Sequence, residues 1–108
     1  MKPLTEVLRD FNEARDMYDI LELKLISDQS EILRRLSVCN SHLAEHRIDA
    51  HTKWLSYQYN STAKSQSGKD READMKTPEL YQIRHIMTAV KLLMDSVRST
   101  ISTHKKEQ

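Results

Sequence analysis

Residues 77–104, TPELYQIRHIMTAVKLLMDSVRSTISTH, decide the fold of this chain. Apolar side chains recur there at alternating steps of three and four residues, the spacing of a helix that packs on another helix. The stripe comprises Leu80, Ile83, Met87, Val90, Met94, Val97 and Ile101, with His104 in the same register. Thr77, Pro78 and Glu79 supply an N-cap, a first-turn proline and an acid facing the helix dipole. The pattern predicts a long amphipathic helix over residues 77–105.

Two similar stripes precede this helix. The first comprises Leu4, Val7, Phe11, Ala14, Tyr18, Leu21 and Leu25, and the second comprises Ile32, Leu36, Cys39, Leu43, His46, Ala50, Lys53 and Tyr57. Around Asp28 and Glu31 the register slips by four residues. That slip is either a capping box that begins a new helix or a stutter in a continuous one. We slightly prefer a continuous or gently bent helix over residues 4–59.

Composition supports a single all-α domain. The 108 residues include one Gly and two Pro, too few turn formers for a sheet protein, and one cysteine, which excludes an intrachain disulfide. The expected parts are an acidic N-terminal helical arm over 4–27, a second helical stretch over 28–60, a basic polar loop and lead-in over 61–76, and the C-terminal helix. Within the third part, the Ser, Lys and Gln-rich composition up to Asp70 predicts an exposed flexible loop, and 71–76 predicts a helical lead-in.

The expected lengths predict self-association. A helix over 4–59 would run roughly 80 Å, whereas the C-terminal helix would cover about 40 Å of it. The uncovered apolar stripe would need a partner. We therefore expect a long helical hairpin or coiled-coil-like bundle completed by homo-oligomerisation through Phe11, Tyr18, Leu21 and Leu25.

Three histidine patterns suggest chemistry only weakly. His42 to His46 has the His-x-x-Glu-His form of inverted zinc peptidases, but the chain is too short for that class and shows no third ligand motif. Cys39, His42, His46 and Asp49 form a helical row with metal-ligand spacing, although stripe positions explain Cys39 and His46 equally well. Arg98 with His104, and Arg35 with His42, match the loose motif of the helical HEPN ribonucleases. We predict neither an enzyme nor a metal or cofactor site.

Cations and aromatic residues alternate at the end of the second stretch and in the loop after it. The segment contains Lys53, Trp54, Tyr57, Tyr59, Lys64, Lys69, Arg71 and Lys76. Single-stranded nucleic acid is bound in this way, with bases on aromatic faces and phosphates on cations. A core role for Trp54 and Tyr57 beside a solubilising loop is an almost equally good interpretation.

The order of these features resembles the UvsY-type recombination mediators of tailed phages. The similarity covers roughly residues 30–105 and rests on the segment 53–59, on 69–76 and on the end of the last helix, 95–99. Leu55 stands where family members carry an Arg. The resemblance implies a homo-oligomer that binds single-stranded DNA, displaces a single-strand-binding protein and loads a RecA-like recombinase.

The function predicted from the sequence is therefore a non-enzymatic, oligomeric single-stranded-DNA-binding recombination mediator. We expect it in the cytoplasm of a bacterium or a phage-infected cell, without membrane contact. The alternative is a coiled-coil adaptor, assembly chaperone or inhibitor that binds another protein helix. A HEPN-like ribonuclease is a remote second alternative.

Overall fold

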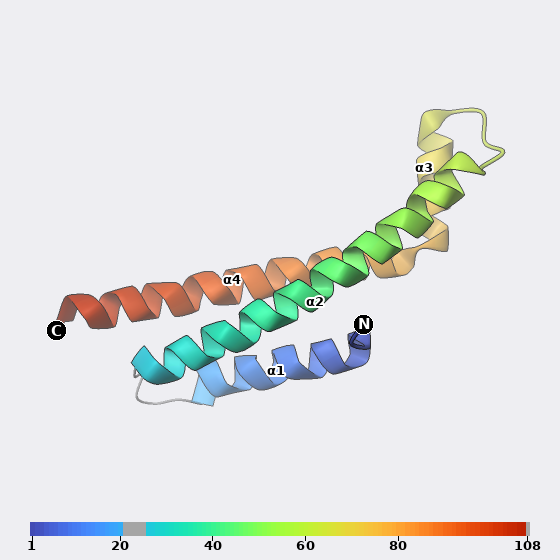
Figure 1. The fold of residues 1–108 in the computed structure, drawn as a ribbon. Helices are drawn as coiled ribbons and strands as arrows, with labels where there is room; N and C mark the ends of the chain where they lie inside the picture. The colour runs from blue at the N-terminus through green and yellow to red at the C-terminus, as the bar shows by residue number, and fades with distance from the viewer. Residues whose placement is uncertain (21–25, 108) are drawn as a thin grey trace.

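The computed structural model describes residues 1–20 and 26–107, with side chains up to residue 103. The described chain forms four helices, α1 (Leu4–Ile20), α2 (Ile26–Tyr59), α3 (Gln66–Lys76) and α4 (Pro78–Glu107). They form an elongated body of 62 × 25 × 17 Å (Figure 1). The all-α fold is confirmed for these residues.

Helices α2 and α4 form an antiparallel hairpin, and α1 folds back along it (Figure 1). The start of α1 lies against the middle of α2, where the carbonyl oxygen of Lys2 is 2.6 Å from Nε2 of His46. The end of α1 lies against the end of α4, where the hydroxyls of Tyr18 and Thr100 are 3.2 Å apart. The predicted continuous or gently bent helix over 4–59 is therefore wrong, because α1 buries its apolar face by folding back along α2 and α4.

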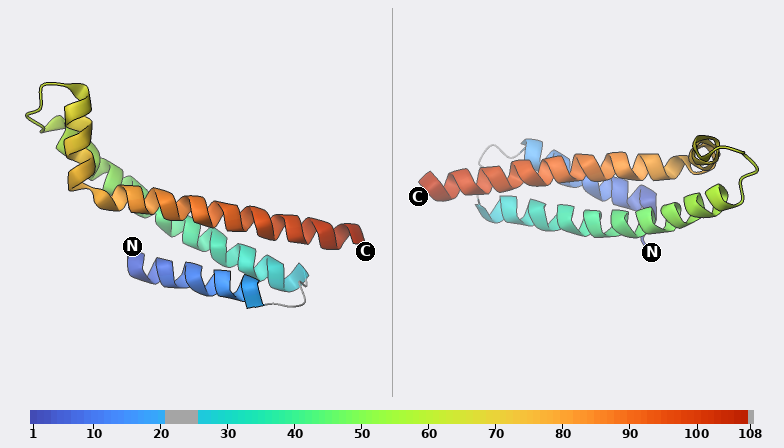
Figure 2. Two further views of the ribbon diagram at one scale, coloured as in Figure 1. Left: turned by 180° about the vertical axis from the view of Figure 1, so that it is seen from behind. Right: turned by 90° about the horizontal axis from the view of Figure 1, so that it is seen from above.

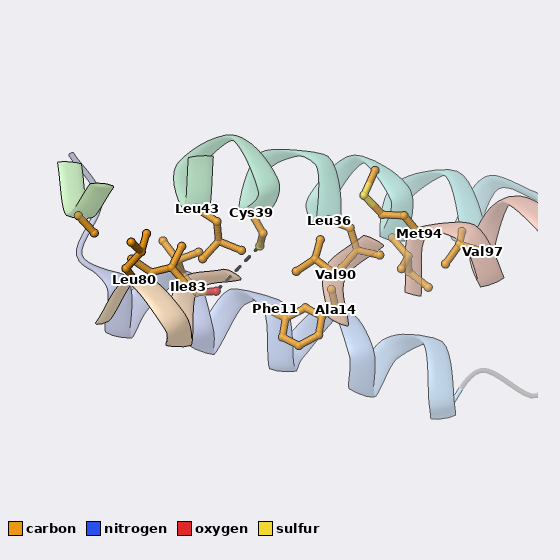
Figure 3. Packing of buried hydrophobic residues seen from close by; sticks show 13 residues of the cluster. Phe11, Ala14, Leu36, Cys39, Leu43, Leu80, Ile83, Val90, Met94 and Val97 are labelled. Atoms are coloured by element: carbon orange, nitrogen blue, oxygen red, sulfur yellow. Dashed lines mark hydrogen bonds between the residues drawn. The ribbon is translucent and has the colours of Figure 1, made fainter. Parts of the chain in front are cut away.

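The three long helices share one apolar core (Figure 3). Its buried members are Val7, Phe11, Ala14, Ile32, Leu36, Cys39, Leu43, Ala50, Leu80, Ile83, Val90, Met94 and Val97. All of them belong to the three predicted stripes. The stripe on α2 leaves the core after Ala50, and Lys53 and Tyr57 are exposed because α1 does not extend that far.

This arrangement removes the length argument for self-association. Helix α1 covers part of α2 within the same chain, so the long uncovered stripe on which the homo-oligomer prediction depended is absent from the described residues. Phe11 is buried in the core and Tyr18 is half-buried against α4. Leu21 and Leu25, the other two residues predicted to mediate self-association, lie outside the described residues.

Helix α3 turns away from the body at a kink with α4 (Figure 1). Ser65 caps its first turn by accepting a hydrogen bond from the amide of Gly68 at 3.1 Å. A Cβ on Gly68 would lie 3.0 Å from Oγ of Ser65, so this tight turn favours glycine. Thr77 ends α3 with φ −129° and ψ 60°, since the proline after it disfavours helical backbone. The predicted flexible loop is thus wrong for residues 66–70, which are helical.

Candidate nucleic-acid interface

The structure brings the predicted DNA-binding residues to one end of the molecule, here called the tip, residues 53–76 (Figure 1). Lys53, Trp54, Tyr57 and Tyr59 lie in the last turns of α2, Lys64 in the connection, and Lys69, Arg71 and Lys76 on α3. The prediction therefore names residues that lie near one another. Their partners decide whether a ligand can use them.

The aromatic residues of the tip differ in how freely they face solvent. Trp54 is half-buried, and its indole N–H donates to Oδ1 of Asp74 at 2.7 Å, which attaches α3 to α2. Tyr57 is 39% exposed, with Nζ of Lys76 lying 5.4 Å from its ring centroid. Tyr59 is 88% exposed. Only Tyr59 therefore presents most of its ring to solvent.

Carboxylates pair with two of the five cations of the tip. Lys53 pairs with Asp49 at 3.4 Å, and Lys76 pairs with Glu72 at 3.1 Å. Glu72 also accepts a hydrogen bond from the Ser61 hydroxyl, and these two partners lower the pKa of its carboxyl below the ordinary value. Because the carboxylates sit beside the lysines, the tip presents a weaker positive field than its lysine content suggests.

A second basic surface lies between α2 and α4. A shallow hollow of about 540 Å³ there is lined by the cations Arg47, Arg84, Lys91 and Arg98 and by Asn40, Met87, Thr88 and Met94. We call this hollow the basic groove. Arg84, Lys91 and Arg98 are spaced seven residues apart on α4, so they form a row of about 21 Å along one face.

Two further hollows adjoin the basic groove at Arg84. One, of about 280 Å³, is lined by Arg47, Ile48, His51 and Arg84. The other, of about 550 Å³, lies where α3 meets α4, and we call it the kink hollow. Its lining residues are Arg71, Asp74, Met75, Thr77, Pro78, Leu80, Tyr81, Gln82 and Arg84. Arg84 lines all three hollows, and we call the three together the basic channel.

Most cations of this face are unpaired. Among the described residues, Arg47, Arg71, Arg84 and Lys91 form no ion pair, and Arg98 pairs with Asp95 at 3.5 Å. Asp74 is the one carboxylate in the lining of the three hollows. Unpaired guanidinium groups spaced along a groove attract polyanions strongly.

Helix α1 leaves this face open. It packs on the opposite flank of α2 and α4, through Cys39 and His46 on α2 and Thr100 on α4. No α1 residue lines any of the three hollows. In the view from above in Figure 2, the α2–α4 pair lies in front of α1. The described part of the acidic arm therefore does not cover the basic groove.

The basic groove was not predicted from the sequence. A signal was present, because Arg84, Lys91 and Arg98 recur every seven residues. Arg47 could not be added to them from the sequence, because only the pairing of α2 with α4 places it in the same hollow. Tyr81, 76% exposed beside Arg84, was missed for the same reason.

Several residues of the histidine patterns make contacts within the protein. Sγ of Cys39 lies 4.0 Å from the carbonyl oxygen of Val7, and burial raises the pKa of its thiol. His46 contacts the backbone of Lys2. Within the described residues, no three His, Cys, Asp or Glu side chains are placed to hold a metal ion. Of the HEPN-like pairs, Arg35 pairs with Glu31, Arg98 pairs with Asp95, and the side chain of His104 is outside the described part.

Comparison with known proteins finds no matching family model, no matching curated protein and no matching solved structure. In the part of the chain that the structure describes, no helix combines the length and apolar character needed to span a bilayer.

Proposed function

We propose that this protein is a non-enzymatic binder of single-stranded nucleic acid, and that the basic groove is its phosphate-binding surface. The observation that supports this function best is the row of cations on the face that α1 leaves open, in which Arg84 and Lys91 form no ion pair with any described residue. A strand lying along α4 would place successive phosphates near Arg84, Lys91 and Arg98, with Arg47 contributing from α2.

The proposed site differs from the one predicted from the sequence. Arg71 remains part of the proposed site because it lines the kink hollow. Tyr59 is exposed at the end of α2 but lines none of the three hollows. Lys53 and Lys76, which are paired with carboxylates, contribute less. The tip thus becomes an extension of the groove.

The cellular role that we propose is recombination mediation, which rests on the resemblance to UvsY-type proteins. A mediator must hold a strand long enough to exchange a single-strand-binding protein for a RecA-like recombinase. A groove with few cations binds weakly on its own, and self-association would raise the overall affinity by avidity. We place this activity in the cytoplasm of a bacterium or a phage-infected cell.

A protein-binding adaptor is the second candidate. A hollow of about 450 Å³ on α1 is lined by Met17 and by Ile20, which is 76% exposed. The charged residues Glu13, Asp16 and Arg35 complete the lining, and an apolar surface bordered by polar residues is typical of a protein-binding site. An adaptor would show no salt-sensitive binding of DNA, so a single measurement separates the two candidates.

The test is fluorescence anisotropy of a labelled single strand titrated with protein at about 50 and 200 mM salt. If four cations each contact one phosphate, affinity should fall roughly fiftyfold between the two salt concentrations. The double variant Arg84→Ala/Lys91→Ala should weaken binding at the lower salt by roughly a hundredfold, because it removes two charge-assisted contacts worth about 1.5 kcal/mol each.

The matched control is Lys53→Ala/Lys76→Ala, which removes the same charge from side chains that are already paired. We expect it to weaken binding less than about threefold. Equal losses in the two variants would show that net charge, and not the groove, determines affinity. Absence of binding at low salt would overturn the proposed function.

A further inference from the structure

The kink hollow differs in composition from the rest of the basic channel. Beside the cations Arg71 and Arg84, it is lined by the aromatic ring of Tyr81 and by Met75. Tyr81 and Met75 are each 76% exposed, although both are large apolar side chains. Exposed apolar groups gathered in one hollow beside cations indicate a ligand that is both apolar and charged.

Tyr81 presents a flat aromatic surface at the kink hollow. Its ring stacks on His85, one turn along α4, with centroids 6.3 Å apart and planes 11° apart. The kink between α3 and α4 brings Met75 and Arg71 to the same hollow. A planar ring entering the hollow could therefore lie against Tyr81 and contact the thioether of Met75.

The charges that line the kink hollow favour an uncharged base inside it and a phosphate beside it. Asp74 lines the hollow, and its Oδ1 accepts the indole N–H of Trp54 at 2.7 Å. A carboxylate repels a phosphate but leaves an uncharged nucleobase unaffected. Arg84 lines both this hollow and the basic groove, where it can attract the phosphate next to that base.

We infer that the kink hollow accepts one unstacked nucleobase, with Tyr81 as its stacking surface, and that this contact makes the groove selective for single strands. In a duplex the bases are stacked and paired, so none can enter the hollow without disruption of the helix. The inference rests on the proposed function, because it assigns the base-reading part of the same nucleic-acid site.

The experiment compares two labelled strands of equal length, an oligodeoxythymidylate and an abasic strand with the same phosphates. Anisotropy titrations at about 50 mM salt use the wild type, Tyr81→Ala, Tyr81→Phe and Arg84→Ala. The wild type should prefer the base-bearing strand by about tenfold, since stacking of a base on an aromatic side chain is typically that strong. Tyr81→Ala should abolish the preference, and Tyr81→Phe should retain it.

Arg84→Ala should weaken the binding of both strands alike, because it acts on the phosphates. Since Tyr81 is mostly exposed, circular dichroism should show unchanged helicity in both Tyr81 variants. If the wild type binds the two strands equally, or if Tyr81→Ala keeps the preference, the inference is wrong while the phosphate-binding function stands. If neither strand binds, the proposed function fails as well.

Discussion

The protein has two regions rich in Lys and Arg, and they differ in what surrounds the cations. At the tip, Lys53 pairs with Asp49 and Lys76 with Glu72, whereas Lys64, Lys69 and Arg71 form no ion pair with any described residue. Along the basic groove, Arg47, Arg84 and Lys91 form no ion pair with any described residue. The proposed function depends on this difference, because carboxylates beside cations weaken the field that attracts a polyanion.

The carboxylates of the tip have a structural reason to be there. Helix α3 has little apolar surface, and only Ala73 of its residues is buried. Hydrogen bonds attach it to α2 instead, from Gln58 to Asp70 at 2.6 Å and from Trp54 to Asp74. The groove needs no such attachment, because the apolar core beneath it holds α2 and α4 together.

The largest effect that we predict tests the contrast between the apolar core beneath the groove and the hydrogen bonds that attach α3. Leu43 is fully buried in the core beneath the groove. Leu43→Ala should lower the free energy of unfolding by about 2–5 kcal/mol, as large-to-small core substitutions do. Tyr59→Ala, at the exposed end of α2, should change it by less than about 0.5 kcal/mol. Urea denaturation followed by circular dichroism measures both, and similar losses in the two variants would contradict the contrast.

The same contrast explains which parts of the fold could be predicted from the sequence. Apolar spacing predicts all the core residues and the start of the last helix, because burial and capping depend on local patterns. The return of α1 along α2 was missed, since a four-residue slip is compatible with both a stutter and a new helix. The helical lead-in predicted over 71–76 is confirmed as the second half of α3. Its first half, residues 66–70, was missed because polar contacts with α2, such as Gln58 to Asp70, stabilise it more than its own apolar pattern does.

The groove was missed for a different reason. The prediction took the cations near Trp54 without their partners. Glu72 lies four residues before Lys76, on the next turn of α3, and pairs with it. For Arg84, Lys91 and Arg98, the spacing gives a common face but not the side on which α1 packs. That side is decided by tertiary contacts such as that of Tyr18 with Thr100.

A second, smaller effect should appear when the tip is made to resemble the groove. Asp49→Asn/Glu72→Gln removes the two carboxylates that pair with Lys53 and Lys76. Affinity for a single strand at about 50 mM salt should rise two- to threefold and return to the wild-type value at about 200 mM, because exposed charges are screened by salt.

The control for this variant makes an equal charge change on α1. Glu13→Gln/Asp16→Asn neutralises two exposed carboxylates on the flank away from the groove. It should leave affinity unchanged in the same anisotropy titration. An equal rise in both variants would show that overall charge explains the gain.

The smallest predicted effect concerns acid and the attachment of the tip. The hydroxyl of Ser61 and the ammonium of Lys76 lower the pKa of Glu72 from its ordinary value of 4.5, so the folded state favours the ionised carboxylate. The resulting stabilisation is fully present above pH 4.5 and is lost as the pH falls through the lower folded pKa. In the body, by contrast, Arg34 and Arg35 lower the pKa of Glu31 to about 2, so that carboxylate stays ionised at moderately acidic pH.

Trp54 provides the measurement, because it is the one tryptophan of the chain and it binds α3. As the pH falls from 4.5 through the lower pKa of Glu72 in the folded state, its emission should shift toward longer wavelength while helicity at far-ultraviolet wavelengths changes little. Glu72→Gln should show a smaller shift over the same range, because its amide does not titrate. An identical shift in that variant would mean that protonation of another group loosens the tip, and the predicted contribution of the Glu72 carboxylate would be wrong.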